Sequence, residues 1–319
     1  MNDRRPLLVF LGSLVALSGG FVAISWLADV SMLVLLPAYM FTPMLAGIVT
    51  CIAGGPSFEA AGLRFPHGRF RWLAVAAAVP ILLVLVGTAI ALAIPGVEFV
   101  PDANPLTGEG TEFAETQTQD GEAAAGPDLP GWPWNLLITI VAALVFGVTI
   151  NAVLAFGEEF GWRGVLLTEL APFGFWGASA IIGVLWGLWH APGILEGYNY
   201  PNYPVVGAGV MTLACLAMSP VYTYVTMQAK SVLAPTILHG TFNGFAATML
   251  VFAQGGHELL VNSVGGMGIL AFGLAAVVIA VRGAPDLERE WALPDEGTAG
   301  EGETRDRDSG PLEASPPEE

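Results

Sequence analysis

Three stretches of the sequence place polar side chains within otherwise apolar surroundings. They are Glu158-Glu159-x-x-x-Arg163, Trp186-x-x-x-His190 and His239-x-x-x-Asn243. Carboxylates and imidazoles can move protons, and amide or imidazole N–H groups can stabilise a developing oxyanion. Glu158 or His190 could therefore deprotonate a water molecule. His239 and Asn243 could donate to the oxyanion, so the set amounts to a hydrolytic site without a nucleophilic Ser or Cys.

The spacing within each stretch indicates which side chains meet. Glu159 and Arg163 are four residues apart, which predicts an ion pair along one helix. Successive helical residues point about 100° apart, so we expect Glu158 to face a different neighbour. His239 and Asn243 share one helical face. The apolar pattern resumes after Arg163, so the helix is expected to continue towards Pro172.

Each stretch also has a structural interpretation that involves no catalysis. The acidic pair could be an interfacial turn, His190 could belong to an aromatic belt, and His239 with Asn243 could join two helices. A zinc ion held by Glu158, His190 and His239, with Glu159 as base, is a further alternative. The sequence lacks the His-Glu-x-x-His helix of zincins.

Composition places these residues in a membrane protein. The 319 residues are 54% hydrophobic and only 12% charged, with a mean hydropathy of +0.64. Soluble domains carry about 25% charged residues, so a soluble or a disordered chain is excluded. A net charge of −17 with eleven basic residues argues against nucleic-acid binding. The long apolar runs lack the alternation of barrel strands, which favours helices.

Apolar runs of about twenty residues predict eight transmembrane helices and an all-α, polytopic helical bundle. They cover roughly residues 6–26, 31–53, 72–95, 134–157, 175–194, 205–228, 232–253 and 263–281. We expect a membrane domain over 1–283, with its functional core at 134–253. Residues 95–133 would form an acidic external loop and 284–319 an acidic, disordered cytoplasmic tail.

The charges predict an orientation. With a cytoplasmic N-terminus and eight spans, all eleven basic residues fall on the cytoplasmic side, as the positive-inside rule requires. We therefore expect a multi-pass cell-membrane protein with both termini cytoplasmic. The acidic loop and tail, together with a single lysine, Lys230, resemble the composition of proteins adapted to high salt.

The three stretches resemble the motifs of the CAAX-protease and bacteriocin-processing (CPBP, or Abi) family of intramembrane endopeptidases. Their order and spacing match, as does the Ser-x-x-Ala-Pro sequence that ends at Pro235, and the resemblance covers about residues 134–250. One departure is Trp186, where Phe is commoner. We expect this change to alter the wall of a pocket but not its chemistry.

The resemblance implies an endopeptidase with a membrane cavity open to the cytosol. Glu158 and His190 would activate water, His239 and Asn243 would stabilise the oxyanion, and Glu159 with Arg163 would support the site. The family carries both metalloprotease and glutamic-peptidase labels, so Zn²⁺ stays open as a cofactor, although the amide of Asn243 favours glutamate chemistry.

The implied partners are membrane lipids and a peptide or membrane-protein substrate. Two other functions compete with proteolysis. One is a non-catalytic relative, such as an immunity or scaffold protein. The other is a transporter or a cofactor protein with His190 and His239 as ligands.

Overall fold

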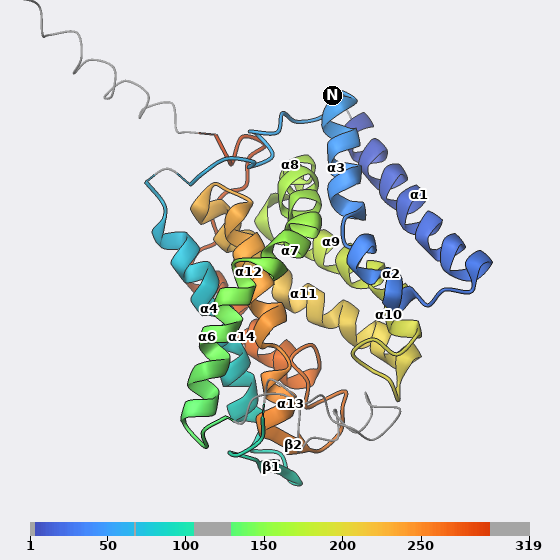
Figure 1. Cartoon of the computed structure of the whole chain (residues 1–319). Coiled ribbons are helices and arrows are strands. Elements are labelled where there is room, and N and C mark those ends of the chain that lie inside the picture. Colours follow the sequence, from blue (N-terminus) through green and yellow to red (C-terminus); the bar gives the residue numbers. More distant parts are fainter. Residues whose placement is uncertain (1–3, 67, 105–128, 294–319) are drawn as a thin grey trace, which may run out of the picture.

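The computed structural model describes residues 4–66, 68–104 and 129–293, which are almost entirely helical (Figure 1). The main helices are α1 (Arg5–Ala28), α2 (Met32–Tyr39), α3 (Thr42–Ile52), α4 (Arg71–Ala91), α6 (Trp134–Gly147), α7 (Ile150–Glu159), α9 (Gly174–Trp189), α11 (Pro204–Ala229), α12 (Leu233–Phe245) and α14 (Gly266–Arg282). All eight predicted segments are helical, which confirms the predicted fold class. Helices satisfy their own backbone polar groups, as a lipid environment requires.

Short elements connect these helices. They are the π-helix η1 (Phe160–Leu166), α8 (Leu167–Glu169), the 3₁₀-helix η2 (Ala171–Phe173), α10 (Ala191–Leu195), α13 (Thr248–Phe252), β1 (Val97–Phe99) and β2 (Ala253–Gly255). The two strands pair antiparallel, with Glu98 opposite Gln254. This pairing joins the described part of the predicted 95–133 loop to the segment that follows α13.

The chain is a multi-pass membrane protein. Among the described residues, five helical segments are long and apolar enough to cross a membrane, and α6 with α7 makes a sixth if the bent pair is one span. The sequence predicted eight spans. The difference arises because α12 has 13 residues and α14 has 17. At 1.5 Å per residue, α12 is about 20 Å long, whereas the hydrocarbon core is about 30 Å thick.

Helix α12 lies among α4, α6, α7 and α11, so its residues are central in the bundle. Small residues allow the close approach. A Cβ atom on Gly240 would overlap the carbonyl oxygen of Gly147. Asn151 also donates a hydrogen bond from Nδ2 to the Gly240 carbonyl, 3.2 Å away. This crossing fixes α12 against α6 and α7.

Replacing Gly240 with alanine should therefore destabilise the bundle. We expect Gly240→Ala to lower the free energy of unfolding by about 1–3 kcal/mol, because two packed backbones must separate. Thermal unfolding in detergent measures the effect. Gly209→Ala is the matched control, since nothing lies within 4 Å of its added Cβ. Equal stability of the two variants would contradict the close crossing.

The helix that carries the acidic pair is neither straight nor uniform. The predicted 134–157 span is bent by 55° between Gly147 and Ile150. Beyond Glu158 the helix continues to Glu169, as predicted, but Phe160–Leu166 is π-helical. π-Helical turns are rare and occur often at functional sites.

The predicted cytoplasmic segments meet at one end of the molecule, here called the basic end (Figure 1). Arg64 donates to the Ala292 carbonyl at 2.7 Å, and Lys230 donates to the Leu293 carbonyl at 2.9 Å. Residues 95–104 and 253–255 lie at the opposite end, here called the sheet end. The predicted inner and outer segments thus separate in space.

The start of the predicted tail is ordered. Trp291 is 6% exposed, and its indole N–H donates to the Thr168 hydroxyl at 3.0 Å. Arg289 forms an ion pair with Glu169 at 2.9 Å. Residues 284–293 therefore belong to the packed domain, because an apolar ring and a charge partner hold them. The rest of the tail, like residues 105–128 of the loop, lies outside the described residues.

Candidate active site

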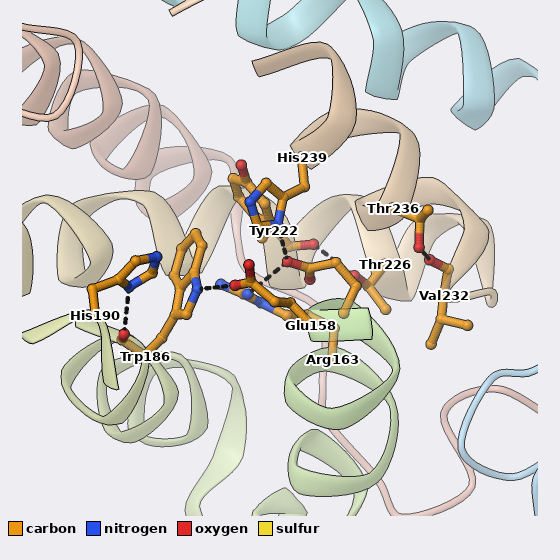
Figure 2. Close-up of polar contacts among 10 residues, drawn as sticks. Glu158, Arg163, Trp186, His190, Tyr222, Thr226, Val232, Thr236 and His239 are labelled. Atoms are coloured by element: carbon orange, nitrogen blue, oxygen red, sulfur yellow. Dashed lines mark hydrogen bonds and ion pairs between the residues drawn. The ribbon is translucent and has the colours of Figure 1, made fainter. Parts of the chain in front are cut away.

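Glu158 is the last but one residue of α7 and is 1% exposed. Its Oε2 accepts a hydrogen bond from the indole N–H of Trp186 at 2.7 Å (Figure 2). The expectation that Trp in place of Phe changes no chemistry is therefore wrong. A phenyl ring has no donor, whereas this indole holds one oxygen of the buried carboxylate.

The predicted ion pair between Glu159 and Arg163 is confirmed. Their Oε1 and Nη1 atoms are 3.0 Å apart, and both side chains are fully buried. The guanidinium also lies over the rings of Trp186 and Tyr222, with Cζ 4.3 and 4.7 Å from the ring centroids. A buried cation is stabilised by an anion and by aromatic faces. Arg163 has both.

His239 connects α12 to the same carboxylate. Its Nδ1 lies 2.8 Å from Oε1 of Glu159, the oxygen that also binds Arg163 (Figure 2). An ionised carboxylate only accepts, so Nδ1 carries the hydrogen. This contact fixes the orientation of the imidazole and leaves its Nε2 for other partners.

His190 follows the last residue of α9 and is half-buried. Its Nδ1 lies 2.7 Å from the carbonyl oxygen of Trp186 (Figure 2). A carbonyl oxygen accepts only, so Nδ1 is the donor. In a neutral ring, Nε2 is then a hydrogen-bond acceptor and a base. Trp186 thus contacts Glu158 through its side chain and His190 through its backbone.

A cavity of about 320 Å³ contains the predicted site. Glu158, His190, His239 and Asn243 line it together with Trp186. Apolar side chains form much of the rest of the wall, including Leu36, Met40, Leu154, Met211, Met218, Phe242 and Leu250. Helices α7, α9 and α12 therefore bring the four residues to one space. Glu159 and Arg163 lie behind its wall.

Residues 132–245 match the sequence profile of the type II CAAX prenyl endopeptidase family, Rce1-like. These residues form a domain of this family. All seven residues singled out from the sequence lie within it. No curated protein matched the chain.

The endopeptidase domain does not build its cavity alone. The cavity is also lined by Leu36 and Met40, which precede residues 132–245 in the sequence, and by Leu250 and Val264, which follow them. Flanking parts of the chain therefore shape the space beside the motif residues.

Sequence reasoning missed Tyr222, whose ring contacts Arg163, Trp186 and His239. It belongs to a polar stripe on α11, made of Ser219, Tyr222, Thr223 and Thr226, all fully buried. Polar residues at intervals of three or four in an apolar helix indicate a face turned towards the bundle interior. That spacing was the available signal.

The alternative zinc site is not supported by the geometry. Within residues 4–66, 68–104 and 129–293, no group of three His, Cys, Asp or Glu side chains could hold a metal ion. Glu158, His190 and His239 therefore do not fit a zinc ion as they stand.

Proposed function

We propose that the protein is an intramembrane endopeptidase that hydrolyses peptide bonds with a water activated by Glu158 and His190. One observation carries the proposal: these two residues share a cavity with His239 and Asn243 inside a type II CAAX prenyl endopeptidase domain. The family name supports a protein or peptide substrate. Membrane lipids would surround the bundle.

In the first step, the carboxylate of Glu158 takes a proton from water while the water oxygen attacks the carbonyl carbon of the scissile bond. The Trp186 indole holds one carboxylate oxygen in place. His190 offers Nε2 as an acceptor for the second hydrogen of the water, because its Nδ1 is bound to a backbone carbonyl.

The oxyanion of the tetrahedral intermediate needs donors at the opposite side of the reacting carbon. The amide of Asn243 and the Nε2–H of a doubly protonated His239 would supply them. Glu159 provides the counter-charge for that imidazolium. When the C–N bond breaks, Glu158 returns its proton to the departing amine, which restores the carboxylate.

Asn243→Ala should lower kcat by about 10²–10³, the usual cost of losing one oxyanion donor. The side chain of Asn243 is exposed to the cavity, so little stability should be lost. Turnover of a fluorogenic peptide by the purified protein, with thermal unfolding of the same sample, measures both. Unchanged kcat would remove Asn243 from the site.

His190→Ala tests the reaction class in cells. We expect intact substrates to accumulate in the membrane proteome of a strain carrying this variant, compared with wild type. The reason is that loss of a proton-transfer partner costs about 10²–10⁴ in rate. Mass spectrometry of new peptide termini identifies the cleaved bonds. Identical termini in both strains would argue for a non-catalytic role.

We further propose that the basic end is cytoplasmic, as its arginines and Lys230 favour. Reporters fused after the C-terminus or within residues 54–57 should then read cytoplasmic, and one within 95–104 should read external. A protein with its acidic loop inside the cell would give the opposite pattern.

A further inference from the structure

Trp189, the last residue of α9, is held by residues that precede the endopeptidase domain in the sequence. The buried hydroxyl of Tyr39, at the end of α2, donates to the Trp189 carbonyl oxygen at 2.9 Å. The two rings are stacked, with their centroids 4.5 Å apart and an interplanar angle of 17°. The indole N–H of Trp189 donates in turn to the hydroxyl of Thr42, the first residue of α3, at 3.1 Å. Residues 39–42 therefore fix both the backbone and the side chain of Trp189.

His190 lies directly after Trp189, at the junction of two helices. Helix α9 ends at Trp189 and α10 begins at Ala191. The last carbonyl groups of a helix have no donor within it, and the Tyr39 hydroxyl satisfies one of them. Pro192 has no N–H, so it cannot extend the hydrogen bonding of α9 across the junction. The direction in which the His190 side chain leaves the backbone therefore depends on contacts from other helices.

Two contacts hold the imidazole of His190. Its Nδ1 binds the Trp186 carbonyl oxygen at 2.7 Å, which sets the tautomer. Its ring lies edge-on to the Trp189 ring, with the centroids 5.0 Å apart and the planes at 82°. The hydrogen bond leaves rotation about its own axis free, and the neighbouring indole limits that rotation. A displacement of Trp189 would therefore change the direction in which Nε2 points.

The same segment, residues 39–42, also reaches the Glu158 side of the site. Met40 lines the cavity. A Cβ atom on Gly157 would lie 2.8 Å from the Met40 carbonyl oxygen, so α7 packs on the break between α2 and α3 one residue before Glu158. The segment thus contacts both of the helices that carry the residues proposed to activate water.

Building on the proposed function, we propose that Tyr39 is a positioning residue for His190. Its hydroxyl and its ring hold Trp189, and Trp189 holds the imidazole so that Nε2 is directed at the water that Glu158 deprotonates. Tyr39 acts through Trp189 and is not among the residues that line the cavity. The segment between α2 and α3, which lies outside residues 132–245, thereby supplies part of the geometry that the reaction requires.

Tyr39→Phe removes the hydroxyl and keeps the ring, so it tests the contact with the Trp189 carbonyl alone. We expect kcat on a peptide cleaved by the unmodified protein to fall by about 10- to 100-fold, because a small misplacement of a reacting group is costly. KM should stay unchanged, since the lost interaction serves only the chemical step.

Tyr200→Phe is the matched control. Tyr200 is also fully buried, and its hydroxyl donates to a backbone carbonyl, that of Val264, at 2.6 Å. Both variants should lose similar amounts of thermal stability, because each leaves a buried carbonyl without its hydroxyl donor. Only Tyr39→Phe should lower kcat, which separates positioning of His190 from a general structural role.

A spectroscopic measurement tests the same contact without any requirement for activity. The chain has four histidines, and NMR of ¹⁵N-histidine-labelled protein in detergent identifies the signals of His190 by comparison with His190→Ala. We expect the Nδ1–H tautomer in the unmodified protein, as donation to the Trp186 carbonyl requires. Tyr39→Phe should shift the ring-nitrogen signals of His190, and Tyr200→Phe should leave them in place.

A lower kcat at constant KM, together with shifted His190 signals, would support the proposal. It would be overturned by a kcat equal to that of Tyr200→Phe, or by His190 signals that stay in place in Tyr39→Phe. Inactivity of the unmodified protein on every peptide would instead count against the proposed function, and the NMR comparison would still decide whether Tyr39 sets the imidazole. If Tyr39→Phe does not accumulate, Thr42→Val, which removes the acceptor of the Trp189 indole, is judged by the same criteria.

Discussion

Glu158→Gln is expected to reduce proteolysis by about 10²–10⁴ while the protein remains folded. The amide oxygen of glutamine can still accept the hydrogen bond from Trp186, so the local packing is retained. An amide cannot take a proton from water, so the chemical step is lost. Cleavage of a substrate identified in cells, measured with the purified variant, gives the reduction in kcat.

Glu59→Gln is the matched control. Glu59 lies in the loop at the basic end, its side chain is 62% exposed, and its distance from Arg64 is 3.9 Å. The same chemical change there should leave kcat unchanged. Full activity of Glu158→Gln on a verified substrate would contradict the proposed role of this carboxylate.

Arg163→Ala is expected to lower the free energy of unfolding by about 3–5 kcal/mol, because it removes the guanidinium that pairs with the fully buried carboxylate of Glu159. The rings of Trp186 and Tyr222 would also lose the guanidinium between them. Activity should fall with the amount of folded protein. Thermal unfolding in detergent and the yield of monodisperse protein measure the loss.

The double variant Glu159→Leu with Arg163→Met separates stability from chemistry. Replacing a buried ion pair with apolar residues of similar volume is often neutral, so stability should largely return. Proteolysis should not return, since His239 loses the carboxylate that orients it. Recovery of activity in this variant would show that the ion pair has no part in the reaction.

The sequence predicted correctly the features that depend on residue spacing within a single helix. Helical periodicity predicted that Glu159 and Arg163 share one face and form an ion pair, and that Glu158 faces another neighbour. The ion pair is present, and Glu158 contacts Trp186. Apolar length located all eight helical segments. These properties depend on spacing within one segment, and spacing is visible in the sequence.

Contacts between helices were harder to predict. The indole of Trp186 meets Glu158 only because α7 and α9 pack at a particular height, and Tyr222 reaches Arg163 only because α11 lies beside both. The 55° bend follows Gly147, whose carbonyl oxygen packs against Gly240, and the π-helical turn packs through Gly161 against Pro43. Residues 284–293 looked like the rest of an acidic tail, yet Trp291 finds a partner more than one hundred residues away.

The packing of residues 289–293 at the basic end has a consequence for how the chain is made. The loop that receives Trp291 contains Gly62, where a side chain would meet the indole ring. Ribosomes add about 5–20 residues per second, so this loop waits on the order of tens of seconds for its partner. During that interval Glu169 lacks Arg289. A chain that ends before Arg289 never gains this contact, so we expect its basic end to stay less tightly packed than that of the full chain.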